Sequence, residues 1–106
     1  MLVIKTWCLP EMKEEQLQKL FQTILANVMN IPQLRVESER DMLCLFPSDM
    51  MKYGLGQEIL VEVTGFPGSL ELSWRTTLSS NLRGILHRFL PKARIILFVN
   101  GVEMIL

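Results

Sequence analysis

The sequence has no excess of charge of either sign, and this excludes functions that depend on a strongly basic surface. Eleven basic residues balance eleven acidic ones, so the formal net charge is zero. Proteins that bind nucleic acids or anionic membranes present a basic patch. The nearest group of cations is typical of a solvated helix end; it consists of Arg83, His87, Arg88, Lys92 and Arg94. We expect neither a nucleic acid nor a membrane as a partner.

Long hydrophobic runs are also missing. No apolar run approaches the roughly 20 residues that span a bilayer, and the first residues lack the basic region and apolar stretch of a signal peptide. These absences predict a cytoplasmic protein. Cys8 and Cys44 are the two cysteines, and both lie in apolar, strand-like segments. In a reducing compartment we expect them to be free, buried thiols rather than a disulfide.

The residues that form metal and cofactor sites are scarce. His87 is the single histidine, and its spacing from Cys8 and Cys44 matches no metal-binding pattern. The glycines do not form a phosphate-binding loop, and no G-x-S-x-G motif is present. The sequence therefore predicts neither a metal nor a cofactor.

Charged residues are few relative to apolar ones, at 21% against 49%. A chain of 106 residues forms one domain, which we place at residues 1–106. Such a composition leaves few residues to solvate the surface. Either both faces of a sheet are covered or part of the surface is an interface between subunits, and we expect an oligomer.

The sequence does contain an internal repeat. Leu2-Val3-Ile4 and the following residues to Pro10 are echoed from Ile59 to Pro67, and the segment from Ile31 to Val36 is echoed from Leu90 to Ile95. The offsets of the two echoes are nearly equal. We place the two pseudo-repeats at about 1–46 and 57–100. Repeated units bury together an apolar face that one unit cannot bury alone.

Each repeat predicts a strand, a helix and a second strand. In the first, we expect a strand over 2–7, a helix over 12–29 with apolar residues at helical spacing, and an irregular strand from 34–36 through 42–46. In the second, we expect a strand over 57–64, a helix that begins after Ser69 and ends before Pro91, and a strand over 94–99. One apolar stripe of this second helix also carries Arg75.

The predicted fold class is α+β. Right-handed crossovers place both helices on one face of a four-stranded mixed sheet. Alternation on the first and third strands sends Lys5 and Glu62 to the less apolar face, where they pair if the two strands are antiparallel neighbours. Asn100-Gly101 predicts a turn into a short final strand over 102–106. We expect that apolar tail to pair with the sheet edge of a neighbouring subunit.

This doubled arrangement resembles the tautomerase superfamily, which includes 4-oxalocrotonate tautomerase and macrophage migration inhibitory factor. The resemblance covers nearly the whole chain, in architecture more than in motif. Its points are Val3-Ile4 leading to Leu9-Pro10, Pro32 and Pro91 after the helices, and Lys92-Ala93-Arg94-Ile95 at the start of the last long strand. It implies a homotrimer with pockets between the subunits.

The chemistry of that superfamily depends on an N-terminal proline, whose amine acts as a general base beside a carbonyl. Leu2 follows Met1 here, so we expect Met1 to be retained and to take the place of the proline. A free α-amine titrates near ~7.7 and serves as a base or forms an imine. The alternative is that the site has lost its catalyst.

The other site candidates follow from the same resemblance. Ile96 and Phe98 take the places of pocket tyrosine and asparagine residues on the last long strand, and Asn30 takes the place of a pocket lysine. These differences predict an apolar pocket. We add Phe66, in the turn after the third strand, as a substrate-binding candidate. Arg40 either recognises a carboxylate or belongs to a solvated charge cluster.

Two functions are compatible with these residues. The first is a divergent tautomerase or isomerase of small keto acids that uses the Met1 amine. The second is an inactive trimeric protein whose apolar pocket between subunits binds an apolar ligand or a partner protein.

Overall fold

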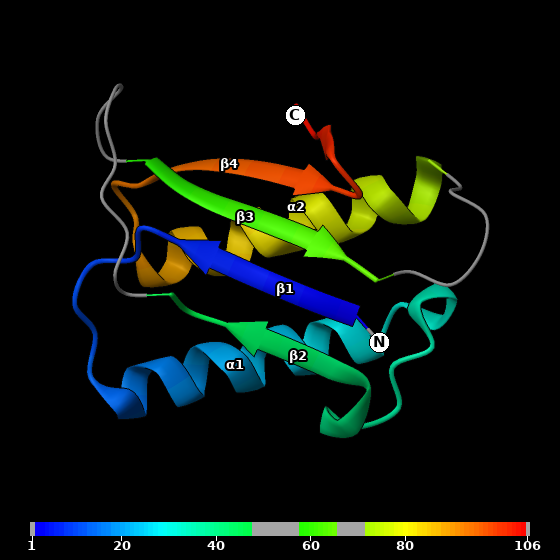
Figure 1. Ribbon diagram of the computed structural model, residues 1–106, viewed down its shortest axis with the longest axis horizontal. Helices are drawn as coiled ribbons and strands as arrows, with labels where there is room; N and C mark the ends of the chain where they lie inside the picture. Colours follow the sequence, from blue (N-terminus) through cyan, green and yellow to red (C-terminus); the bar gives the residue numbers. More distant parts are fainter. Residues whose placement is uncertain (1, 48–57, 66–71, 106) are drawn as a thin grey trace.

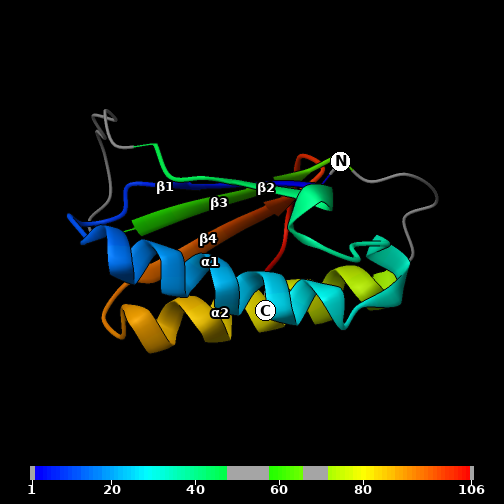
Figure 2. The same ribbon diagram turned by 90° about the horizontal axis from the view of Figure 1, so that it is seen from below.

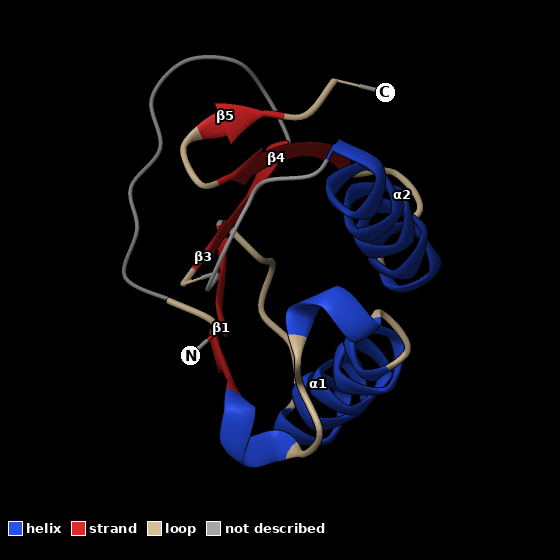
Figure 3. Cartoon of the chain, turned by 90° about the vertical axis from the view of Figure 1, so that its right-hand side faces the viewer, coloured by secondary structure: helices blue, strands red, loops and turns tan. Residues whose placement is uncertain are grey.

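The computed structural model describes residues 2–47, 58–65 and 72–105. It shows one sheet with two helices side by side on one of its faces (Figures 1, 2 and 3). The elements are β1 (Leu2–Trp7), α1 (Glu14–Met29), β2 (Met42–Leu45), β3 (Glu58–Thr64), α2 (Leu72–Phe89), β4 (Arg94–Val99) and β5 (Val102–Glu103). Two short 3-10 turns, η1 (Pro32–Leu34) and η2 (Glu39–Asp41), connect α1 to β2.

The strand order is β2-β1-β3-β4-β5. β1 and β2 are parallel, β3 and β4 are parallel, and β1 and β3 are antiparallel at the centre. Each repeat is therefore a β-α-β unit, and both helices lie on the same face, as predicted. The sheet has five strands rather than the predicted four, because β5 pairs with β4 of its own chain.

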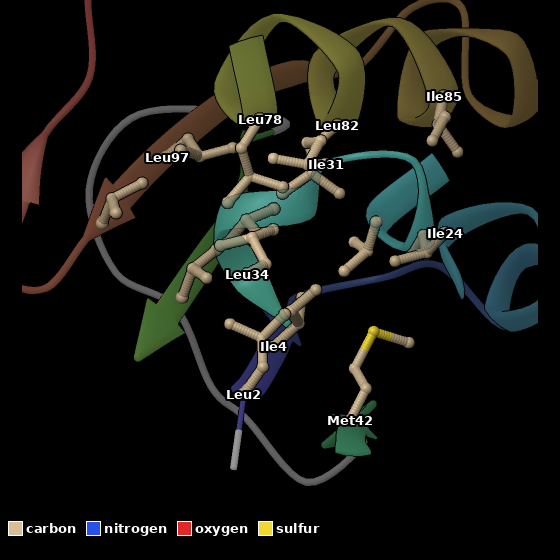
Figure 4. Packing of buried hydrophobic residues seen from close by; sticks show 14 of the residues in the cluster. Leu2, Ile4, Ile24, Ile31, Leu34, Met42, Leu78, Leu82, Ile85 and Leu97 are labelled. Carbon is tan, nitrogen blue, oxygen red and sulfur yellow. The ribbon is translucent and has the colours of Figure 1, made fainter. Parts of the chain in front are cut away.

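Alternation along the strands explains which face the helices cover. Leu2 and Ile4 of β1 are buried under the helices, whereas the intervening residues face the uncovered side. Two helix stripes close over them, and Ile24 and Leu82 meet the strands in one continuous cluster (Figure 4). Burial of this apolar area is the main favourable term for the fold.

The helix predicted over 12–29 begins two residues later, at Glu14. Gln16 lies in its first turn, and its Oε1 accepts a hydrogen bond from the backbone N–H of Lys13 at 3.0 Å. The backbone is extended at Lys13, and this hydrogen bond caps the first turn that follows it. The helix therefore begins at Glu14.

The strand predicted at 34–36 is wrong. Pro32 begins the 3-10 turn η1, and Arg35 has a left-handed φ of 54°. A proline has a fixed φ that suits the first residue of a helical turn. Leu34 and Val36 are nevertheless buried. Their apolar character correctly predicted that they are buried. It did not distinguish a strand from a turn that packs against the core.

Residues 102–103 of the C-terminal segment pair with β4 of their own chain, and the expected pairing of the tail with a neighbouring subunit stays a prediction. Asn100 and Gly101 both have positive φ, 50° and 80°, and they join β4 to β5 in a two-residue turn. The N–H of Met104 then donates to the carbonyl of Leu97 at 2.8 Å. The Asn-Gly turn was predicted, and its tight geometry brings the tail back onto β4.

Candidate functional site

The candidate catalytic end lies where β1 begins. β1 lies between β2 and β3, with Leu2 in register with Met42 and Val3 in register with Thr64. Leu2 is buried. Met1, the predicted base, directly precedes Leu2 and lies outside the described residues, as does Phe66. Met1 is thus bonded to a strand that pairs with β2 on one side and with β3 on the other.

Arg40 belongs to this end of the sheet. It lies in η2, two residues before the Met42 that is in register with Leu2. Two local contacts fix the backbone of η2: the Ser38 hydroxyl accepts from the N–H of Arg40 at 3.3 Å, and the Asp41 carboxylate accepts from the N–H of Glu37 at 3.0 Å. Arg40 itself is exposed. Its position fits either of the two interpretations given to it, carboxylate recognition or a solvated cluster.

Arg75 is a second cation at the same end, and sequence reasoning did not identify it as a site residue. It lies near the start of α2, which begins at the end of the sheet where β1 begins (Figures 1 and 2). The side chain is half-buried, and its Nε is shielded from solvent without a hydrogen-bond partner among the described residues. The signal was present in the sequence, since a cation on an apolar helix stripe is costly to bury unless it is paired.

The uncovered face of the sheet carries a polar pair at its centre. Lys5 and Glu62 lie directly opposite each other on β1 and β3, which confirms the predicted register. The Trp7 indole Nε1–H donates to Oε1 of Glu62 at 2.6 Å. This bond between neighbouring strands orients the indole ring over the open face. Trp7 is therefore a residue of the open face rather than of the core.

Ile96 and Phe98 lie on this open face, far from Arg40 within one chain. In register, Ile96 neighbours Leu60 and Phe98 neighbours Glu62. Both are half-buried. β1 and β3 separate them from β2 and η2, so one chain does not bring the predicted apolar residues and Arg40 into one pocket.

The two cysteines are free thiols, as predicted, and both are only partly buried. Cys44 is in register with Ile4 on the helix side of β2 and packs against the core. Burial raises its pKa to about 12, because the charged thiolate loses solvation there. A pKa this high keeps the Cys44 thiol protonated at neutral pH, which lowers its nucleophilicity.

The described residues contain no group of three or more histidine, cysteine, aspartate or glutamate side chains arranged to hold a metal ion. No helix in the described part of the chain has the length and apolar character needed to cross a bilayer. The cations Arg40 and Arg75 lie at this end of the sheet together with the carboxylates of Glu39 and Asp41 in η2.

Comparison with known proteins finds likeness in structure, with three matching chains among the solved structures. No family model matches the chain, and no curated protein matches it. A solved structure of malonate semialdehyde decarboxylase, studied in wild-type, mutant and inactivated forms to explain its decarboxylase and hydratase activities, superposes with a TM-score of 0.57. The two chains are 18% identical, and the match covers 93% of this chain and 84% of the other. The chain therefore has the tautomerase-superfamily fold, which confirms the resemblance at the level of architecture.

Proposed function

We propose that this protein moves a proton beside the carbonyl group of a small keto acid, with the α-amine of Met1 as the base. The observation that carries the proposal is the position of Met1. It directly precedes β1, the strand held between β2 and β3 in a tautomerase-superfamily fold. A malonate semialdehyde decarboxylase, which also has a hydratase activity, shares this fold, and malonate semialdehyde is a small acid with a carbonyl group.

A primary α-amine has the basicity that this chemistry needs. Its ordinary pKa near ~7.7 leaves a useful fraction unprotonated at neutral pH. The free base removes a proton from the carbon next to the carbonyl, or from the hydroxyl of the enol, and returns it at the other position. An imine between the amine and the carbonyl carbon is the alternative route, and it releases water when it forms.

The cations at the start of β1 supply the recognition of the acid. Arg75 brings a half-buried guanidinium with no partner for its Nε among the described residues, and Arg40 brings an exposed one. A guanidinium binds a carboxylate through two parallel hydrogen bonds and fixes its orientation. We assign the substrate carboxylate to Arg75 first, because a half-buried cation gains more from a counter-charge than an exposed one.

We propose that the working form is a homotrimer assembled through the open sheet faces. Apolar side chains on this face remain exposed in one chain, among them Leu43 and Leu45 on β2. Ile96 and Phe98 lie on the same face and do not meet Arg40 within one chain. In a trimer, these two residues of one subunit line the pocket at the start of β1 in the next subunit.

The second candidate function is a trimeric binding protein without catalysis, in which the same pocket holds an apolar ligand or partner. The apolar character of Ile96 and Phe98 favours it. The two functions differ in whether the amine of Met1 is required.

Ketonisation of phenylpyruvate and decarboxylation of malonate semialdehyde, followed by ultraviolet absorbance, test the proposal. We expect turnover with the free amine and a loss of roughly 100-fold or more when Met1 is acetylated, because the acetylated nitrogen is no longer a base. Mass spectrometry establishes beforehand that Met1 is present and unblocked. Turnover that is unchanged by acetylation removes the amine mechanism, and no turnover of either acid favours the binding protein.

The Arg75→Gln variant tests the substrate assignment separately. We expect KM to rise roughly tenfold, the effect of losing a charge-assisted hydrogen bond. Arg88→Gln removes one cation from the other end of α2 and serves as the matched control, with KM unchanged. An equal effect of both variants points to general electrostatics rather than to a carboxylate site.

A further inference from the structure

A pocket of about 410 Å³ lies at the opposite end of the sheet, where α2 ends and β4 begins. This volume is in the range of small-molecule sites, roughly 300–1,000 Å³. α2, the first residues of β4 and the C-terminal segment all contribute to it. Its side chains include Arg83, His87, Arg94, Ile96, Glu103 and Ile105.

Arg83 is held in place by hydrogen bonds to backbone carbonyl groups, which are neutral. Its Nη1 donates to the carbonyl of Ile95 at 2.7 Å, and its Nη2 donates to the carbonyl of Met104. The Nε is shielded from solvent and has no hydrogen-bond partner in the described ranges. Carbonyl oxygens orient a guanidinium but do not cancel its charge, so Arg83 is a fixed, half-buried cation that gains from an anion nearby.

The edge of β4 is already occupied by groups of the same chain. His87 lies one turn after Arg83 on α2, and its Nε2 is 3.2 Å from the carbonyl of Ala93. The carbonyl of Ile95 accepts from Arg83, and that of Leu97 accepts from Met104. Three alternate carbonyls along the edge therefore have donors. This arrangement disfavours the addition of a further strand and leaves the pocket free for a small ligand.

The charges and apolar groups around the pocket define its ligand. Arg83, Arg94 and His87 are basic, and Glu103 is the carboxylate among the residues that line it. In the formal count, with the histidine neutral, the two arginines and Glu103 leave one positive charge in excess, which suits a singly charged anion. Ile105 is 82% exposed beside these cations and gains from an apolar cover.

We propose that this pocket binds a small monocarboxylate with an apolar chain or ring. The carboxylate lies against Arg83 and Arg94, and the apolar part covers Ile96 and Ile105. Its charged residues, Arg83, Arg94 and Glu103, are not among those assigned to the amine site at Met1, and Ile96 is the one residue that both proposed pockets use. The carboxylate site therefore does not depend on the amine of Met1.

A titration with hexanoate, followed by ¹H–¹⁵N correlation spectra of the full chain, tests the proposal. We expect saturable shifts of the backbone amides in 83–87, 94–96 and 103–105. Hexanamide has the same apolar chain without the charge, and we expect it to bind roughly tenfold more weakly. Inorganic phosphate, the probe for a general anion site, has no apolar part to cover Ile96 and Ile105, and we expect it to bind more weakly than hexanoate and to give smaller shifts at the same concentration.

Three variants locate the carboxylate. Arg83→Met should weaken hexanoate binding roughly tenfold or more, the loss of a charged hydrogen bond. Arg94→Gln, an exposed cation, should weaken it roughly threefold, and Glu103→Gln should strengthen it by a similar factor. Arg88→Gln is the matched control, because Arg88 lines a separate groove between the two helices. We expect it to leave the affinity unchanged.

The two surface variants keep the test decisive if Arg83→Met does not fold. The proposal is overturned if hexanamide binds as well as hexanoate, if Arg94→Gln and Glu103→Gln both leave the affinity unchanged, or if phosphate produces the same shifts. It is also overturned if the shifts appear at the start of β1 rather than here. Acetylation of Met1 should not alter hexanoate binding, which separates this site from the proposed active site.

Discussion

Cys44 shows how the position of one side chain decides its chemistry. Its side chain lies on the face of β2 that the helices cover, and it is the one titratable residue of that strand. Burial raises its pKa from 9.0 to about 12. The unfolded chain gives up this proton near the ordinary value, whereas the folded chain retains it. The favourable contribution of the buried thiol is therefore complete below pH ~9 and is lost as the pH rises toward 12.

This difference predicts a steeper loss of stability in alkali for the wild type than for Cys44→Ala. Between pH 9 and 10.5 we expect the free energy of unfolding of the wild type to fall by up to about 1 kcal/mol more per pH unit than that of the variant. Urea denaturation at three pH values measures both slopes. Parallel slopes would show that the thiol is accessible to solvent in the folded state.

Two arginines of α2 illustrate what the sequence could and could not reveal about the candidate sites. Arg75 was visible as a cation on an apolar stripe, so its burial was foreseeable. The partners of Arg83 were not foreseeable, because Ile95 and Met104 lie 12 and 21 residues away and meet only after the tail folds back. Local spacing reports which side chain is unusual, and tertiary contacts decide what it does.

At the scale of elements, the long periodic segments and the Asn100-Gly101 turn were predicted correctly, whereas the connection between α1 and β2 was not. The predicted strand over 94–99 coincides with β4, and the helix predicted over 12–29 differs from α1 at one end only. Between α1 and β2, however, Pro32 and Arg35 impose a turn on residues with an apolar, strand-like sequence. A long element repeats its period over several turns, whereas a connection of a few residues depends on one or two backbone angles.

Substitution of alanine for glycine is expected to have opposite effects on the free energy of unfolding at two positions. Gly84 lies inside α2, and a methyl group added there meets no atom within 4 Å. Gly84→Ala should therefore raise the free energy of unfolding by about 1 kcal/mol, since alanine loses less backbone entropy in a helix.

Gly101→Ala is the matched control, and we expect it to lower the free energy of unfolding. A methyl group also meets no atom at this position, but Gly101 has a φ of +80° that alanine rarely adopts. Urea denaturation of the two variants under one condition compares them directly. A change in the same direction for both would mean that backbone conformation does not govern either position.

At the scale of the whole molecule, the helices cover one face of the sheet and nothing in the described chain covers the other (Figure 2). The exposed Leu43 and Leu45 on β2, and the half-buried Ile96 and Phe98 on β4, lie on this open face. Between these apolar residues lie the Trp7 indole ring and the Glu62 carboxylate, which are joined by a hydrogen bond. Such a surface combines an apolar area with a fixed polar centre, which is the composition of many subunit interfaces.

The proposed trimer makes a prediction that one exposed leucine can test. Leu43→Glu places a charge on the open face, where burial against a neighbour would leave it unpaired, so we expect the trimer to dissociate toward the 12.3 kDa monomer. Met29→Glu is the control, because Met29 is 43% exposed at the end of α1 and Leu43 is 42% exposed. Light scattering after size exclusion measures both masses, and circular dichroism checks that each variant is folded.

A monomeric wild type contradicts the assembly, and a Leu43→Glu trimer places the interface on another surface. In the expected case, Leu43→Glu should also lose keto-acid turnover, because the pocket at the start of β1 then lacks Ile96 and Phe98 of the neighbouring subunit.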